Sequence, residues 1–380
     1  MREDAPQLFI GLMSGTSLDG VDGVLAQFGA VGEDSGIKTL TTAHVNFSPD
    51  LHAELLALQH SGADEIHREA LAGNLLAGCY AACVEQLLSR GCTDAQKVLA
   101  IGAHGQTIRH RPEVGYTRQI NNGALLAELT GIDVITDFRS RDIAAGGQGA
   151  PLVPLFHQQI FGTADQPRVI VNIGGISNIS VVPEQSRDSA VIGFDTGPGN
   201  GLLDVWIQRH LGLAYDAAGN WASSGVINTA LLQTLRDEPF FSLAPPKSTG
   251  RDLFNAAWLD HKLVGFTDLP SADVQATLTE LTATTLADAV QMQTTAADTV
   301  YLCGGGAFNT FLLKRIEAAL RTKDTAITVL STAALGVPPD QVEALAFAWL
   351  SQRFMQRKPG NIPAVTGASG GRICGALYPR

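Results

Sequence analysis

The chain has 380 residues, of which 45% are hydrophobic and 17% charged, so it is predicted to fold, and its length favours two domains. Its formal net charge of −11 argues against nucleic-acid binding, which needs a basic face to neutralise phosphates. A nucleotide ligand is not excluded, because a local cradle of backbone N–H groups and a metal ion outweigh diffuse charge elsewhere.

The N-terminal residues MREDAPQ lack the basic and apolar regions of a signal peptide. The most apolar helical stretch, 75–88, is interrupted by Gly78 and Glu85, so we expect no apolar stretch to approach the length of a membrane span. An odd, scattered set of cysteines is typical of a reducing compartment. These cysteines are Cys79, Cys83, Cys92, Cys303 and Cys374. We therefore expect a soluble protein of the cytoplasm, with no membrane or nucleic-acid partner.

The first predicted elements are two strands within 9–28, joined by the polar turn 14–17. Gly15 has no Cβ and hydroxyls surround it, so such a turn can approach phosphates closely. Asp19 and Asp22 follow the turn, where carboxylates suit a magnesium ion or its waters. An ordinary β-hairpin explains the same pattern, so the segment alone leaves both interpretations open.

Strands and helices alternate along the rest of the first half, which is the α/β pattern. We predict a helix over 64–90, a buried strand over 97–106, and a helix followed by a strand within 124–138, separated at Gly131.

The second half begins with the same device as the first. Residues 168–182 form a predicted strand, a glycine turn and a second strand, about 160 residues after the first hairpin, which indicates a structural duplication. We place the boundary in the polar stretch near 160–167, giving domains 1–165 and 166–380. Further on, 299–309 is a strand running into three glycines, and a helix begins near Asp340.

Four glycine-rich turns follow apolar strands, at 14–17, 174–178, 197–201 and 304–306. The dinucleotide fingerprint G-x-G-x-x-G is missing at the last of these, and the P-loop lysine motif is missing as well, which argues against a nicotinamide oxidoreductase. The pattern favours a nucleotide fold that grips phosphates between two hairpins.

The motifs GTSLDGVD, GAHGQTIRHRP, DFRSRDIAAGGQGAPLVP, NIGGISNIS, GFDTGPGN, PPKSTGRDLF and CGGGAFN occur in this order along the chain. Together they resemble the anhydro-N-acetylmuramic acid kinase family, within the superfamily of sugar kinases, Hsp70 and actin. The resemblance covers essentially the whole chain. It implies an α/β fold of two actin-like (ribonuclease H-like) domains around a central nucleotide and substrate cleft.

The resemblance also implies a reaction. Such kinases use ATP and Mg²⁺ to open the ring of 1,6-anhydro-N-acetylmuramate with water and to phosphorylate O6, which gives N-acetylmuramate 6-phosphate and ADP in peptidoglycan recycling. Ring opening at C1 resembles glycoside hydrolysis, which normally uses two carboxyl groups. Here the phosphoryl group captures the leaving O6, so one carboxylate suffices.

Residue roles follow from the matching motifs. Asp195 of GFDTGPGN corresponds to the catalytic base, although an aspartate before Thr-Gly also caps turns. The expected ATP-binding residues are Gly15, Thr16, Ser17, Leu18, Asp19, Gly20, Val21, Asp22, Gly174, Gly175, Gly304, Gly305 and Gly306, with Asp19 and Asp22 as candidates near the metal. The expected substrate-binding residues are His104, Arg139, Asn172, Gly197 and Glu343.

Some of these positions have structural alternatives. Arg139 suits the lactyl carboxylate and His104 a sugar hydroxyl, but ion pairs and a buried histidine explain them equally well. Glu343 fits a capping box with Asp340 as well as a ligand contact. Lys247, Ser248 and Arg251 can contribute from a loop.

Two rival functions remain open at this stage: a kinase of the same fold for another sugar or small acid, and a non-catalytic ATPase scaffold. The resemblance further implies a homodimer.

Overall fold

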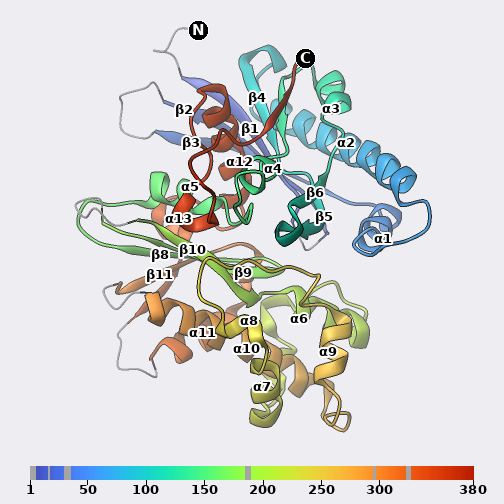
Figure 1. Cartoon of the computed structure of the whole chain (residues 1–380), viewed down its shortest axis with the longest axis vertical. Helices are drawn as coiled ribbons and strands as arrows, with labels where there is room; N and C mark the ends of the chain where they lie inside the picture. Colours follow the sequence, from blue (N-terminus) through green and yellow to red (C-terminus); the bar gives the residue numbers. More distant parts are fainter. Residues whose placement is uncertain (1–5, 16–17, 30–35, 185–189, 294–296, 322–326) are drawn as a thin grey trace. The chain divides into compact units, whose positions relative to one another are not determined.

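The computed structural model describes residues 6–15, 18–29, 36–184, 190–293, 297–321 and 327–380. The chain forms two compact units (Figure 1). Unit 1 comprises Met1–Ile160 and Gln341–Arg380, and unit 2 comprises Phe161–Asp340.

Unit 1 is built on a six-stranded sheet with the order β13-β7-β4-β1-β2-β3. Its strands are β1 (Gln7–Met13), β2 (Gly20–Phe28), β3 (Ile37–Asn46), β4 (Val98–Ala103), β7 (Val134–Thr136) and β13 (Ala376–Tyr378). Strands β1 to β3 form an antiparallel meander, whereas β4 and β7 run parallel to β1. A separate two-stranded sheet pairs β5 (Gln106–Arg111) with β6 (Tyr116–Ile120).

The helices of unit 1 include the longest of the described helices, α2. They are α1 (Pro49–Ala57), α2 (Glu65–Arg90), α3 (Gly123–Thr130), α4 (Ser140–Ile143), α5 (Val153–Phe161), α12 (Val342–Met355) and α13 (Pro363–Thr366). By length and composition α2 could span a membrane, which corrects the expectation that no apolar stretch reaches that length. However, Leu76, Tyr80 and Leu87 on one face of α2 are buried in the hydrophobic core, as in a core helix of a folded unit.

Unit 2 repeats the strand order of unit 1. Its sheet reads β10-β9-β8-β11-β12, with an antiparallel meander followed by parallel strands, as in β3-β2-β1-β4-β7. The strands are β8 (Arg168–Ile173), β9 (Ile176–Val182), β10 (Ile192–Pro198), β11 (Thr299–Cys303) and β12 (Thr328–Ser331). This shared topology confirms the predicted α/β class and the structural duplication.

The helices of unit 2 surround a largely buried helix, α10. They are α6 (Gly201–Leu211), α7 (Thr229–Arg236), α8 (Pro239–Ser242), α9 (Ala256–Lys262), α10 (Ser271–Gln293) and α11 (Thr310–Arg321). Short 3₁₀ helices occupy Ala95–Lys97, Pro112–Val114, Ala217–Gly219, Ala222–Ser224, Gly305–Phe308 and Thr332–Leu335.

The C-terminal segment Gln341–Arg380 belongs to unit 1, which differs from the sequence-based division at 165/166. The reason is a close contact between α12 and the sheet. Gly11 of β1 and Gly102 of β4 are paired in register. A Cβ at Gly11 would lie 1.8 Å from the Ala344 carbonyl oxygen, and one at Gly102 would lie 2.1 Å from that of Phe347. The two glycines thus let the helix backbone rest directly on the strands.

We predict that Gly11→Ala and Gly102→Ala each destabilise the protein, because the added methyl group meets main chain that cannot rotate away. The loss in the free energy of unfolding should be at least about 1–3 kcal/mol, the usual cost of overpacking. Gly78→Ala is the matched control: Gly78 is an exposed position of α2 whose Cβ meets nothing within 4 Å. The control should be neutral or gain up to about 1 kcal/mol. Urea unfolding checks this, and equal behaviour of the three variants would contradict the packing argument.

Candidate functional site

The candidate residues of unit 1 gather at one edge of its sheet. Strands β1, β4 and β7 are parallel, so Ser14, His104 and the segment leading to Arg139 follow their carboxyl ends. In parallel α/β sheets this edge is where ligands bind. Thr16 and Ser17 lie outside the described residues, whereas Gly15 and Leu18 to Asp22 flank them at the start of β2.

The turn after β1 is held by hydrogen bonds from other segments. The Ser14 hydroxyl lies 2.6 Å from the Tyr80 hydroxyl and donates to the Gly105 carbonyl oxygen at 3.2 Å. The Gln106 amide donates to the Gly15 carbonyl oxygen at 3.0 Å. Leu18 has φ +61°, a left-handed backbone that is costly for a branched side chain, and its N–H donates to the Gly15 carbonyl oxygen at 3.3 Å.

His104 links this turn to Arg139. Arg139 can only donate, and its Nη2 and Nε lie 2.9 Å and 3.2 Å from His104 Nε2, so that nitrogen is the acceptor. The other ring nitrogen, Nδ1, therefore donates to the Ser14 carbonyl oxygen at 3.2 Å. Burial and the positive charge of Arg139 lower the pKa of His104 to about 3, which keeps the imidazole neutral. With both nitrogens engaged, His104 orients Arg139.

Arg139 is fixed on a second side by its own loop. Its Nη1 donates to the Gly149 carbonyl oxygen at 2.9 Å. Burial, and to a lesser extent the positive charge of Arg139, lower the pKa of His110 to about 4. Arg139 is thus a preoriented cation at the sheet edge, which is the arrangement that carboxylate recognition uses.

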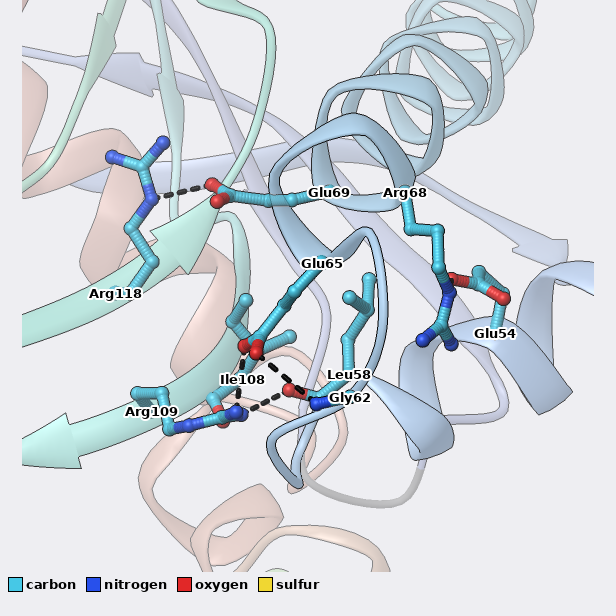
Figure 2. A network of polar contacts seen from close by, with 9 residues as sticks. All are labelled: Glu54, Leu58, Gly62, Glu65, Arg68, Glu69, Ile108, Arg109 and Arg118. Carbon is cyan, nitrogen blue, oxygen red and sulfur yellow. Dashed lines mark hydrogen bonds and ion pairs between the residues drawn. The ribbon is translucent and has the colours of Figure 1, made fainter.

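The neighbouring Arg109 has a structural task (Figure 2). Its Nη2 donates to Glu65 Oε1 at 2.6 Å, and its Nη1 donates to the carbonyl oxygens of Leu58 and Ile108. Arg118 of β6 pairs with Glu69 at 2.5 Å in the same region. These contacts attach the β5–β6 hairpin to α2 and to the segment before it. Arg109 of GAHGQTIRHRP therefore stabilises the fold, whereas His104 of the same motif contacts the candidate site residue Arg139.

Glu343 lies in the first turn of α12, where the helix dipole favours a carboxylate. The capping box with Asp340 is not formed: the N-cap is Gln341, which makes no side-chain capping hydrogen bond. The helix starts one residue later than the spacing of the two acids predicts, so Glu343 is its second residue and not the third that a capping box requires.

The candidate residues of unit 2 also share one sheet edge. Strands β8, β10 and β11 run in one direction, so Asn172, Gly197 and the glycines after Cys303 lie at their carboxyl ends, and Asp195 lies in β10 two residues before Gly197. Asn172 and Cys303 are paired in register, and a Cβ at Gly304 would lie 2.4 Å from Asn172 Oδ1. Gly304, with φ +79°, therefore permits a conformation and an approach that other residues would obstruct.

The glycine turn after β8, at Gly174–Gly175, is hydrogen-bonded to the start of α6. The backbone N–H groups of Gly199 and Gly201 donate to the Gly175 carbonyl oxygen at 3.0 Å, and that of Asn200 donates to Gly174 at 2.7 Å. The turn after β8 and the loop after β10 therefore form one rigid corner beside Asp195.

Asp195 sits at an irregularity of β10. It pairs with Asn178, but Gly197 pairs with Ser177, so Thr196 is an extra residue that bends the strand. Asp195 as a residue is 6% exposed, and its Oδ2 accepts a hydrogen bond from the Thr249 backbone N–H at 2.9 Å. The Asp195 N–H donates to the Lys247 carbonyl oxygen at 3.2 Å. The loop PPKSTG is thus laid along the carboxylate.

Lys247 is the cation of this corner. Its Nζ donates to the carbonyl oxygens of Phe240 and Phe241 at 3.1 Å and 3.3 Å and lies 4.7 Å from the centre of the Phe240 ring. Burial lowers the pKa of Lys247, and the charge of Asp195 opposes that shift. The sequence motif indicated Lys247, but the aromatic platform beneath it and the Thr249 N–H carried no recognisable signal.

Two units that repeat one strand order, each with glycine turns at the carboxyl ends of its strands, define a duplicated α/β fold. The family model for anhydro-N-acetylmuramic acid kinase matches residues 7–380. Proteins of that name from Burkholderia thailandensis and Paraburkholderia xenovorans are 55% and 56% identical, covering 99% and 100% of this chain and 98% and 100% of their own. The chain belongs to the anhydro-N-acetylmuramic acid kinase family, and it is a kinase.

Among solved structures, the activator of the 2-hydroxyisocaproyl-CoA dehydratase from Clostridium difficile with bound ADPNP is 11% identical, with a TM-score of 0.48. That match covers 94% of this chain and 99% of the activator.

Because three histidines are buried in the neutral state, we predict that the free energy of unfolding decreases at acidic pH. The pKa values of His104, His110 and His157 are lowered to about 3, about 4 and about 3, mainly by burial. Unfolded histidines titrate near 6.5, so protons bind the unfolded chain preferentially below that pH. Stability from these residues is complete above pH 6.5 and falls towards pH 3, by up to about 1.4 kcal/mol per pH unit for each histidine.

The measurement is urea unfolding between pH 7.5 and 4.5. His157→Phe should flatten the decline, whereas His60→Gln, at an exposed position, should leave the slope unchanged. A wild-type stability that stays constant over this range would contradict the buried neutral state of these residues.

Proposed function

We propose that the protein couples hydrolysis of the 1,6-anhydro ring of 1,6-anhydro-N-acetylmuramate to phosphorylation of O6 by ATP, giving N-acetylmuramate 6-phosphate and ADP. The observation that carries this proposal is the buried Asp195 carboxylate, held by the Thr249 N–H in a chain matched over its length by kinases of that name. That full-length match disfavours a kinase for another sugar and a non-catalytic scaffold.

Asp195 acts as the general base in this proposal. Water attacks C1, its proton passes to the carboxylate, and the C1–O6 bond breaks. O6 keeps the electron pair of that bond and takes the phosphoryl group, so no second carboxyl group is needed to protonate it. Thr249 fixes one carboxylate oxygen, and Lys247 holds the loop that supplies Thr249. Both are positioning residues for the base.

Arg139 recognises the lactyl carboxylate, oriented by His104 and the Gly149 carbonyl oxygen. Asn172, Gly197 and Glu343 complete the proposed substrate-binding set.

The nucleotide would be held by the two glycine turns and the three glycines after β11. In this proposal Gly15, Leu18 to Asp22 and Gly174–Gly175 would bind the phosphates, and Gly304, Gly305 and Gly306 would allow close approach of adenosine. When bound, Mg-ATP supplies the phosphoryl group and neutralises the charge that develops on it.

The donor set suits magnesium carried by the nucleotide. Within the part of the chain that the structure describes, no group of three or more histidine, cysteine, aspartate or glutamate side chains could hold a metal. Asp22 is paired with His44 at 2.7 Å, while Asp19 is exposed. Mg²⁺ usually takes one or two carboxylates, with substrate phosphates and waters, so Asp19 and Asp22 remain candidates near it.

We also propose a cytoplasmic homodimer without membrane or nucleic-acid partners. The five cysteines are free, which supports a reducing compartment, and the acidic net charge supports the exclusion of nucleic acids. Light scattering coupled to gel filtration tests the dimer.

The base assignment predicts that Asp195→Asn folds normally and loses about 10²-fold or more of kcat, since the amide cannot take a proton. Asp260→Asn, an exposed aspartate of unit 2 paired with Arg209, is the matched control and should keep full activity. Turnover of Asp195→Asn near the wild-type rate would remove Asp195 from this role.

The reaction itself is tested in ¹⁸O-labelled water with Mg-ATP and 1,6-anhydro-N-acetylmuramate, with products read by mass spectrometry. We expect a sugar phosphate with the label on its anomeric hydroxyl, because water attacks C1. A sugar phosphate without label would refute hydrolytic opening, and no sugar phosphate would refute the substrate.

A further inference from the structure

A basic pocket lies in unit 1, apart from the candidate site. It has a volume of about 830 Å³ and brings together Arg141 of α4, Arg357 after α12 and Arg372 near the C-terminus. Ser369 and Gly371 add polar groups, and none of the described residues that line it is an aspartate or glutamate. The chain as a whole has a net charge of −11, whereas the lining of this pocket is positively charged.

The pocket is built on a buried carboxylate. Asp142, on the same helix as Arg141, accepts hydrogen bonds from Asn361 Nδ2 at 2.6 Å and from the Thr366 hydroxyl at 2.7 Å. Asn361 Oδ1 in turn accepts from the Arg372 backbone N–H at 2.7 Å. This chain of contacts joins α4 to the C-terminal segment. Arg141 and Arg372 are therefore attached to one frame, formed by Asp142, Asn361 and Thr366.

The guanidinium groups are incompletely used by the protein. Arg372 donates to the Gly371 carbonyl oxygen at 3.0 Å and to the Ser369 hydroxyl at 3.1 Å. In the described ranges, the side chains of Arg141 and Arg357 have neither a hydrogen bond nor an ion pair. Like charges that converge on one cavity repel each other, and a bound anion removes that cost.

Arg357 occupies a position where glycine would be cheaper. It follows the C-cap of α12 with φ +56°, the left-handed conformation in which helices commonly place glycine. Its side chain is exposed and lines the pocket.

We propose that this pocket is a second anion-binding site, which takes a small metabolite bearing a phosphate group. Planar guanidinium groups pair with phosphate oxygens through two parallel hydrogen bonds, and the volume is within the range of small-molecule sites. The proposal is independent of the reaction at Asp195.

The frame also connects the pocket to Arg139. Asp142 Oδ2 accepts from the Gly149 N–H at 2.8 Å, and the Gly149 carbonyl oxygen accepts from Arg139 Nη1. Arg139 is the N-cap of the short helix that carries Arg141. This link to the substrate rests on the role proposed for Arg139, and through it occupancy of the pocket should change KM for the sugar more than kcat.

The test is isothermal titration of the purified protein with inorganic phosphate and, separately, with glucosamine 6-phosphate, at constant ionic strength. Arg141→Gln and Arg357→Gln should each raise Kd by about tenfold or more, since each removes charged hydrogen bonds. Both side chains are exposed, so the variants should keep the wild-type melting temperature without ligand. Arg118→Gln, another exposed arginine of unit 1, is the matched control and should bind normally.

Arg139→Gln separates the two sites. Phosphate binding that survives Arg139→Gln and is lost in Arg141→Gln and Arg357→Gln supports the pocket. Tighter binding of the sugar ester would identify an organic phosphate, and tighter binding of inorganic phosphate the free ion. Binding lost only in Arg139→Gln, or no binding of either probe by the wild type, overturns the proposal.

Discussion

The contact between α12 and the sheet of unit 1 determines much of the rest of that unit. Because Gly11 and Gly102 lack side chains, the helix lies against the backbones of β1 and β4 and brings Phe347 to the sheet edge. The Phe347 ring is 4.8 Å from His104 and 5.4 Å from Phe138. His104 is thereby buried and neutral, which makes it an acceptor for Arg139. The orientation of Arg139 thus depends on the absence of side chains at Gly11 and Gly102.

Local patterns in the sequence predicted the elements that carry their own signal. The hairpins β1–β2 and β8–β9 and the helix α2 were found from periodicity and glycine turns. Helix α10 was missed, because its buried positions include Gln275, Thr279 and Thr282, which read as solvent-facing. Their polarity is satisfied internally, for example by the bond from the Thr279 hydroxyl to the Gln275 carbonyl oxygen at 2.9 Å. The membership of Gln341–Arg380 in unit 1 depends on contacts between residues more than 200 positions apart, such as Asp142 with Asn361, and no local pattern encodes those.

For the candidate site, motifs named the charged groups but not what holds them. Asp195 was apparent from GFDTGPGN, whereas the strand bulge at Thr196 and the Thr249 N–H that orient it arise only in three dimensions. Likewise, Arg109 and Arg139 look alike in sequence. Arg109 donates its hydrogen bonds to Glu65 and two carbonyl oxygens, whereas Arg139 donates to the neutral His104 at the sheet edge. The distinction is one of partners, which composition does not record.

The discontinuous course of unit 1 has a consequence for biosynthesis. Unit 2 is continuous from Phe161 to Asp340, so a ribosome delivers it whole before α12 has been made. Until Gln341–Arg380 emerges, β1 and β4 expose the apolar face that Ala344, Phe347 and Ala348 later cover. Domains generally complete folding as units during synthesis, and uncovered apolar surface in the interval is prone to aggregation. The portion translated first is therefore the last to be finished, and a nascent chain arrested before Gln341 carries one complete unit and one sheet without its covering helix.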